Sequence, residues 1–180
     1  MLGQLHRTLE WLLEWATIVL MIALTVVVVV GVCYRLAGNS LSWYDEIAVV
    51  QLAWITYYGA ALAALKRRHI GFDTVLLSLP RGARMLGVVV AEALVIGFFA
   101  LMAWAGMEVL TVLEGMGLVS LPWVPIQLTQ SVIPIGAALF IVCELVSLPG
   151  YWRMTADGTS LEFAEIEEEV EQELKKAGEH

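Results

Sequence analysis

Two acidic residues stand inside long apolar runs, where a carboxylate is costly to bury and usually has a specific role. Glu92 is the single charged residue of the apolar run 85–107, and Glu144 is the single charged residue of the run 124–148. Acids in such positions either pair with nearby cations or belong to a proton relay. Both possibilities make Glu92 and Glu144 the first candidates for a functional site.

A basic segment favours the pairing role. Lys66-Arg67-Arg68-His69 directly follows another apolar run, and Arg81 and Arg84 come a few residues later. Counted along their helices at 1.5 Å per residue, both acids lie in the half of the membrane that is nearer to these cations. We therefore expect Glu92 and Glu144 to be structural partners of these cations or of cations on a partner subunit. A proton relay is the alternative.

No cofactor, metal or catalytic site is indicated. His69 is the single histidine away from the termini, whereas a haem held by two histidines or a zinc site needs several ligands. Cys33 and Cys143 form no C-x-x-C pair, and the simplest interpretation is two small buried apolar side chains. The chain also lacks the G-x-x-x-x-G-K-[ST] motif that holds ATP phosphates.

The composition indicates which elements must position these residues. Of the 180 residues, 59% are hydrophobic and 16% are charged, which is typical of a polytopic membrane protein. Spanning the hydrocarbon takes about 20 mostly apolar residues in a helix. We predict an all-α integral membrane protein whose membrane domain, 16–148, has four transmembrane helices at 16–34, 47–65, 85–107 and 124–148.

The two terminal segments differ from the membrane domain. Residues 1–15 have leucines at helical spacing beside Trp11 and Trp15, which predicts an interfacial amphipathic helix that precedes a turn into the membrane. A single long first helix is the alternative. Residues 149–180 are predicted to be an acidic cytoplasmic tail with a helical stripe. With both ends inside, nine of the ten Lys and Arg residues are cytoplasmic and Arg35 alone is outside, as the positive-inside rule requires.

The helix starts carry further signals. Ser42 with Asp45 three residues later predicts a capping box, and Asp45 and Glu46 suit the positive end of a helix. Trp43 suits an aromatic belt at the outer membrane surface. Pro134 lacks a backbone donor, so a kink is expected within the fourth helix.

Taken together, two of these motifs resemble a known family. Ser42-Trp43-Tyr44-Asp45-Glu46 opens a helix, and one span later comes Lys66-Arg67-Arg68-His69-Ile70-Gly71-Phe72-Asp73. This order and spacing is similar to the small membrane subunit of tripartite ATP-independent periplasmic (TRAP) transporters, the DctQ family. The resemblance covers roughly residues 16–148. It implies that the motif residues contact a partner; these are Trp43, Asp45, Glu46, Arg67, Arg68, His69 and Asp73.

The resemblance also implies a function. A large membrane subunit (DctM-like) would carry substrate and sodium, and a periplasmic substrate-binding protein (DctP-like) would deliver an organic anion such as a carboxylate. The small subunit would support transport across the bacterial inner membrane without chemistry of its own, in contact with lipids and with no role for nucleic acid. Two alternatives remain: a small self-sufficient proton-coupled transporter that uses Glu92 and Glu144, and a membrane oxidoreductase.

Overall fold

The computed structural model describes residues 2–67, 80–157 and 170. In this part of the chain, the regular secondary structure consists of helices joined by loops. The basic segment beyond Arg67 and most of the acidic tail lie outside the described residues. Within residues 2–67 and 80–157, four helical stretches are long and apolar enough to cross a membrane. The helices are α1 (Leu2–Leu36), α2 (Tyr44–Leu65), α4 (Arg81–Val112), α5 (Ile126–Gln130) and α6 (Val132–Asp157).

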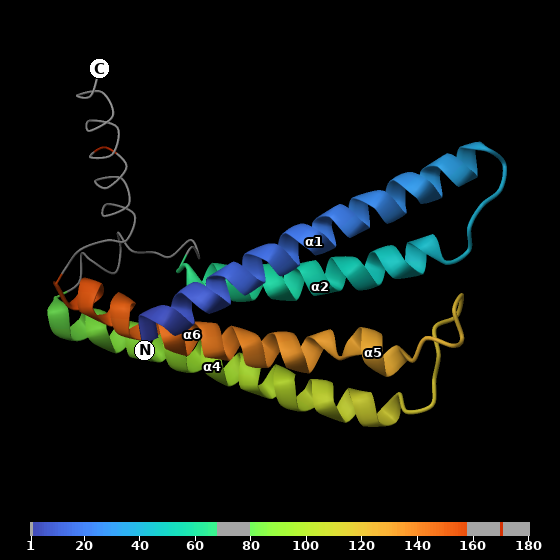
Figure 1. Cartoon of the computed structure of the whole chain (residues 1–180). Coiled ribbons are helices and arrows are strands. Elements are labelled where there is room, and N and C mark those ends of the chain that lie inside the picture. The colour runs from blue at the N-terminus through green and yellow to red at the C-terminus, as the bar shows by residue number, and fades with distance from the viewer. Residues whose placement is uncertain (1, 68–79, 158–169, 171–180) are drawn as a thin grey trace, which may run out of the picture.

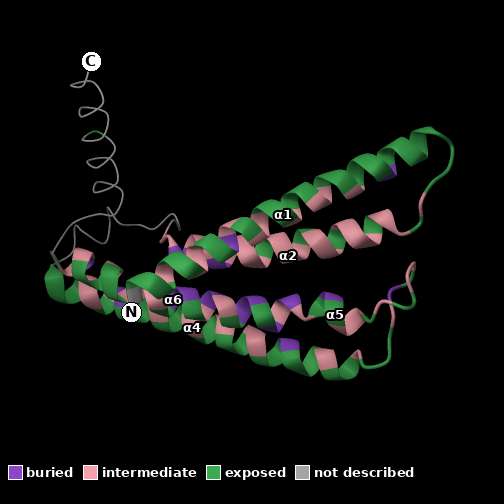
Figure 2. Cartoon of the chain, in the orientation of Figure 1, coloured by how far each residue is buried: buried purple, intermediate pink, exposed green. Residues whose placement is uncertain are grey.

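The helices pack in the order α1, α2, α6, α4, which differs from their order along the chain (Figure 1). Two central helices, α2 and α6, lie against each other, while α1 packs on the other side of α2 and α4 packs on α6. As a result, α6 is the most enclosed helix, whereas α1 and α4 expose most of their surface (Figure 2). The outer helices therefore present long apolar faces to their surroundings.

The core lies toward the end of the bundle where α2 ends. Leu13 of α1, Leu65 of α2 and Cys143 of α6 are all buried there, and the Phe140 ring of α6 stacks on Phe99 of α4 with centroids 3.7 Å apart. Residues from all four long helices thus meet in one cluster.

The first helix differs from its prediction. α1 runs without interruption from Leu2 to Leu36, so the turn expected after residue 15 is absent. Thirty-five residues at 1.5 Å each give about 52 Å, well beyond the ~30 Å of hydrocarbon. The polar first turns must therefore extend outside the apolar layer. An interfacial position for residues 1–15 remains a prediction, now as the extension of a straight helix.

The fourth predicted helix is divided in two. α5 ends at Gln130, α6 begins at Val132, and Ser131 between them donates its hydroxyl to the carbonyl oxygen of Leu128 at 2.7 Å. Pro134 therefore lies in the first turn of α6, where a missing N–H removes no intrahelical hydrogen bond. The kink expected at Pro134 thus takes the form of a one-residue interruption between α5 and α6, within a single membrane-crossing stretch from Ile126 to Ala156. Pro149, by contrast, lies inside α6, which continues past the predicted end at residue 148.

The remaining differences are at helix ends. α2 begins before residue 47, and α4 extends beyond 85–107 on both sides. Hydropathy identifies the apolar part of a helix, whereas the hydrogen-bonded helix continues into polar residues that water can reach.

The close packing of α2 and α6 depends on a small residue, because a Cβ at Gly136 of α6 would come within 2.6 Å of Tyr57 in α2.

Candidate functional site

The candidate site is built around Arg67, which lies two residues after the end of α2. Arg67 has a φ of +53°, a left-handed conformation that an L-residue other than glycine rarely adopts. Its N–H donates to the carbonyl oxygen of Ala64 at 3.2 Å, which closes the end of the helix. Glycine is the usual residue at such a position. Arginine here indicates that the side chain contributes something that outweighs the backbone strain.

The Arg67 side chain enters the bundle and joins α4 to α6. Its Nη1 forms ion pairs with Glu92 of α4 and with Glu144 of α6, the latter at 2.8 Å. Its Nε donates to the Ser147 hydroxyl at 2.8 Å, and its Nη2 donates to the carbonyl oxygen of Glu144 at 3.1 Å. The guanidinium lies over the Tyr151 ring, 4.7 Å from its centroid. One cation thus ties together three helices.

These three charged side chains are largely removed from solvent. The side chains of Arg67 and Glu92 are each 12% exposed, and that of Glu144 is 6% exposed. Buried charges are tolerated when they are paired and hydrogen-bonded. Arg67, Glu92 and Glu144, which we call the inner triad, form the pairing that the sequence analysis favoured for the two acids. Of the cations considered, Arg67 is the one that both acids contact.

A second group of ion pairs joins α1 to the same end of α2. Lys66 forms ion pairs with Glu14 and, at 3.1 Å, with Glu10, both on α1. The hydrogen bond to Glu14 raises the pKa of Lys66, so the ammonium remains charged. The His6 ring lies 3.3 Å from the carbonyl oxygen of Leu65, one of the carbonyls left free at the end of α2. The first turns of α1 therefore hold the end of α2.

At the opposite end of the bundle, the carboxylate of Glu46 binds a loop. Glu46 of α2 accepts hydrogen bonds from the backbone N–H groups of Val119, at 2.9 Å, and Ser120, at 2.8 Å. The Ser120 hydroxyl also donates to the carbonyl oxygen of Ser42 at 2.8 Å. Glu46 therefore fixes the loop between α4 and α5 onto the start of α2.

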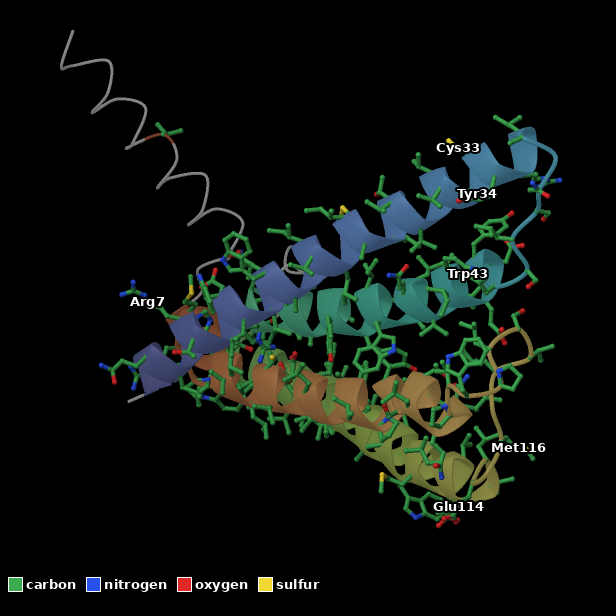
Figure 3. The ribbon with its side chains drawn as sticks, turned by 45° about the vertical axis from the view of Figure 1, so that its right-hand side comes forward. Arg7, Cys33, Tyr34, Trp43, Glu114 and Met116 are labelled. Carbon is green, nitrogen blue, oxygen red and sulfur yellow. The ribbon has the colours of Figure 1, made fainter. Side chains whose placement is uncertain are left out.

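The predicted capping box is not formed. The N-cap of α2 is Trp43, which makes no side-chain capping hydrogen bond, and Asp45 is exposed. The physical reason is that the N-cap lies one residue after Ser42, whose carbonyl oxygen is held by the α4–α5 loop. Figure 3 shows Trp43 at the same end of the bundle as Cys33, Glu114 and Met116, with Arg7 at the other end.

The structure gives different outcomes for the other residues that the sequence analysis considered. Arg68, His69 and Asp73 lie outside the described residues. Arg84 of α4 donates to the carbonyl oxygen of Thr155 in α6 at 3.1 Å, so it holds a helix end and not an acid. Cys143 is buried as expected, whereas Cys33 is exposed, which corrects that expectation. In residues 2–67 and 80–157 no three His, Cys, Asp or Glu residues gather as a possible metal site.

Sequence reasoning missed several participants. Ser147 and Tyr151, which surround Arg67, follow Glu144 on one face of α6 at spacings of three and seven residues. That helical spacing was a usable signal, since such residues share a face with the acid. Glu10 and Glu14 of α1 are four residues apart, so they also share a helix face, and both face Lys66.

The bundle defines a class of protein: a multi-pass helical membrane protein whose intramembrane charges bind one another. A family model described as tripartite ATP-independent periplasmic transporters, DctQ component, matches residues 24–153, well over half of the chain. No curated protein sequence matches the chain. The chain belongs to the DctQ family and is a small permease subunit of a TRAP transporter. The matched region includes both the inner triad and the Glu46 contact.

Proposed function

We propose that this subunit supports sodium-coupled import of an organic anion, a carboxylate. It does so by packing against a large DctM-like membrane subunit. A DctP-like periplasmic protein delivers the substrate to that large subunit. The observation that carries the proposal is the distribution of charge and apolar surface. The charged side chains at the end of the bundle that holds the inner triad, which we call the inner end, bind one another, while α1 and α4 turn long apolar faces outward. This arrangement suits a rigid supporting subunit.

The exposed face of α4 is the better candidate for contact with the large subunit. It combines Gly97 and Ala100 with large exposed side chains such as Phe98 and Trp104. An added Cβ at Gly97 would meet no atom within 4 Å, so the helix leaves open space there. Small residues let a neighbouring helix approach closely in a membrane, which β-branched valines do less readily. The valine-rich face of α1 suits contact with lipid.

A pair of substitutions tests this assignment. Gly97→Leu adds bulk to the exposed face of α4, and Val26→Trp adds bulk to the exposed face of α1 as a matched control. We expect Gly97→Leu to reduce co-purification with the large subunit at least severalfold, while Val26→Trp leaves it unchanged. The opposite result would assign the contact to α1. Equal recovery with both variants would contradict the choice of α4.

The supporting role is distinguished from a self-sufficient transporter by uptake into vesicles. Vesicles that contain this chain alone should not accumulate a carboxylate under a sodium or proton gradient, whereas vesicles with all three components should. Uptake by the chain alone, abolished by Glu92→Gln or Glu144→Gln, would establish the alternative. A spectrum of the purified subunit without visible absorbance would argue against the haem form of an oxidoreductase.

Orientation is tested separately. We propose that both termini face the cytoplasm, supported by the excess of Lys and Arg at the Arg67 end of the bundle. In a background without native cysteines, Asn39→Cys in the α1–α2 loop should react with a membrane-impermeant maleimide added to intact cells. Arg153→Cys should react only after the membrane is opened. The reverse pattern would overturn the orientation and leave the family assignment untouched.

A further inference from the structure

The inner triad is unbalanced in charge. Arg67 supplies one positive charge, whereas Glu92 and Glu144 supply two negative charges when both are ionised. Both acids bring their Oε1 atom to the same Nη1 of Arg67, so the two carboxyl groups lie side by side. Two neighbouring carboxylates in a buried site cannot both ionise cheaply, since like charges repel strongly where water is excluded.

The remaining carboxyl oxygens show what is lacking. Oε2 of Glu92 and Oε2 of Glu144 are both buried, and neither has a hydrogen-bond partner. The Glu144 side chain is 94% removed from solvent, so water does not readily satisfy this oxygen. A buried acceptor without a donor is costly, and each such group in a native protein requires an explanation. Two orphaned oxygens beside an excess negative charge indicate that the site lacks one positive charge and one hydrogen-bond donor.

Among residues 2–67 and 80–157, the other charged and titratable groups at this end of the bundle are engaged elsewhere or carry no positive charge. Lys66, the neighbour of Arg67, is held by two acids of α1, and Arg84 of α4 binds a backbone carbonyl oxygen. Cys143 and Tyr151 of α6 are neutral when protonated. Within the described helices, the titratable groups that pack or bond around this end of α2 include His6, Glu10 and Glu14 of α1, Tyr58 and Lys66 of α2, Arg84 of α4, and Cys143 and Tyr151 of α6.

We propose that the inner triad binds one proton, which Glu92 and Glu144 share at neutral pH. The proton neutralises the cluster against Arg67 and turns one carboxylate into a carboxylic acid. Its O–H then donates to a carboxyl oxygen of the other acid, which relieves one of the two orphaned acceptors. The proton is a fixed part of the folded subunit, because no further acid continues from the triad across the described bundle. This site is independent of which substrate the transporter carries.

Infrared spectroscopy of the purified full-length chain in lipid nanodiscs tests the proposal directly. At pH 7 the native chain should show the carbonyl stretching band of a protonated carboxylic acid, and the band should shift in D2O. Glu92→Gln and Glu144→Gln should each abolish it, because the one remaining acid is then balanced by Arg67. Glu108→Gln, a change at an exposed acid of α4, should leave it in place.

Two spectroscopic outcomes would overturn the proposal. One is the absence of the band from the spectrum of the native chain at pH 7. This outcome does not depend on whether the variants fold. The other is a band that persists in both glutamine variants, because it would then arise from another group. A transport defect in the same variants would have no bearing on this result.

The pH dependence of stability provides a second readout. The folded chain would hold one more proton than the unfolded chain at any pH above the ordinary range of glutamate, about 4.3, until the triad releases its proton. Stability would therefore fall as pH rises, with the unfolding equilibrium constant increasing about tenfold per pH unit. In reversible unfolding in mixed micelles, the slope of stability against pH should be steeper by this amount for the native chain than for Glu144→Gln. Equal slopes in the two proteins would contradict a bound proton.

Discussion

The two ends of the bundle use the same kind of residue in different ways. At the inner end, two glutamates meet an arginine inside the packed helices, with side-chain exposures of 12% or less. At the opposite end, which we call the outer end, Glu46 accepts from the backbone N–H groups of Ser120 and of the exposed Val119. The inner carboxylates are costly to leave unpaired, whereas the outer N–H groups can bond to water. The comparison teaches that a carboxylate's importance depends on what its removal leaves behind.

The largest effect is expected when the cation of the inner triad is removed. Arg67→Met leaves two buried acids without a counter-charge, and breaking a buried pair in this way costs about 3–5 kcal/mol. We expect loss of that size in the free energy of unfolding, measured by reversible denaturation in mixed micelles. Arg153→Gln, at an exposed position on α6, is the matched control and should change little. A loss below about 1 kcal/mol for Arg67→Met would mean that the inner end behaves like a surface ion pair.

The outer loop should be the next most sensitive region, for steric reasons. A Cβ at Gly117 would lie 2.2 Å from the carbonyl oxygen of Pro122, and backbone atoms cannot yield as a flexible side chain does. Gly117→Ala should therefore cost about 1–3 kcal/mol, the range for forcing extra atoms into a packed site. Gly97→Ala is the control, because its added Cβ meets open space. Equal melting temperatures for the two variants would show that the loop adjusts freely.

A smaller effect should separate the backbone of Arg67 from its side chain. Arg67→Gly removes the same charge as Arg67→Met but suits the positive φ of +53°. A left-handed residue with a Cβ costs about 1–2 kcal/mol, so the glycine variant should be more stable than the methionine variant by roughly that amount. Unfolding midpoints of the two variants measure the difference. If the methionine variant were as stable as the glycine variant, the strain inferred at this helix end would be absent.

Much of the fold follows from the sequence, since runs of apolar residues and the cost of bare backbone in lipid determine where helices must be. The pairing of Glu92 and Glu144 with a nearby cation followed from the cost of burying charge. The sequence did not indicate which cation, because that depends on α2 ending in a left-handed residue that directs Arg67 inward. Nor could it locate the break at Ser131, which places Pro134 where its missing donor does no harm.

The role of Glu46 also could not be predicted from the sequence, for a similar reason. A glutamate at a helix start has an adequate local explanation in the helix dipole. Its actual partners, Val119 and Ser120, lie more than seventy residues away and offer backbone groups that any sequence would have. Contacts between a side chain and a distant backbone leave no compositional trace, so they are found only once the helices are placed.

The smallest and most local effect is expected at Glu46. Glu46→Gln keeps one acceptor oxygen but loses the charge and the second oxygen that together bind two N–H groups. Hydrogen exchange at Val119 and Ser120 should accelerate severalfold, while the midpoint of global unfolding stays close to that of the native chain. Asp45→Asn, a change at the exposed neighbouring acid, should alter neither. A global loss as large as that of Arg67→Met would mean that the two ends contribute equally, and the contrast between them would fail.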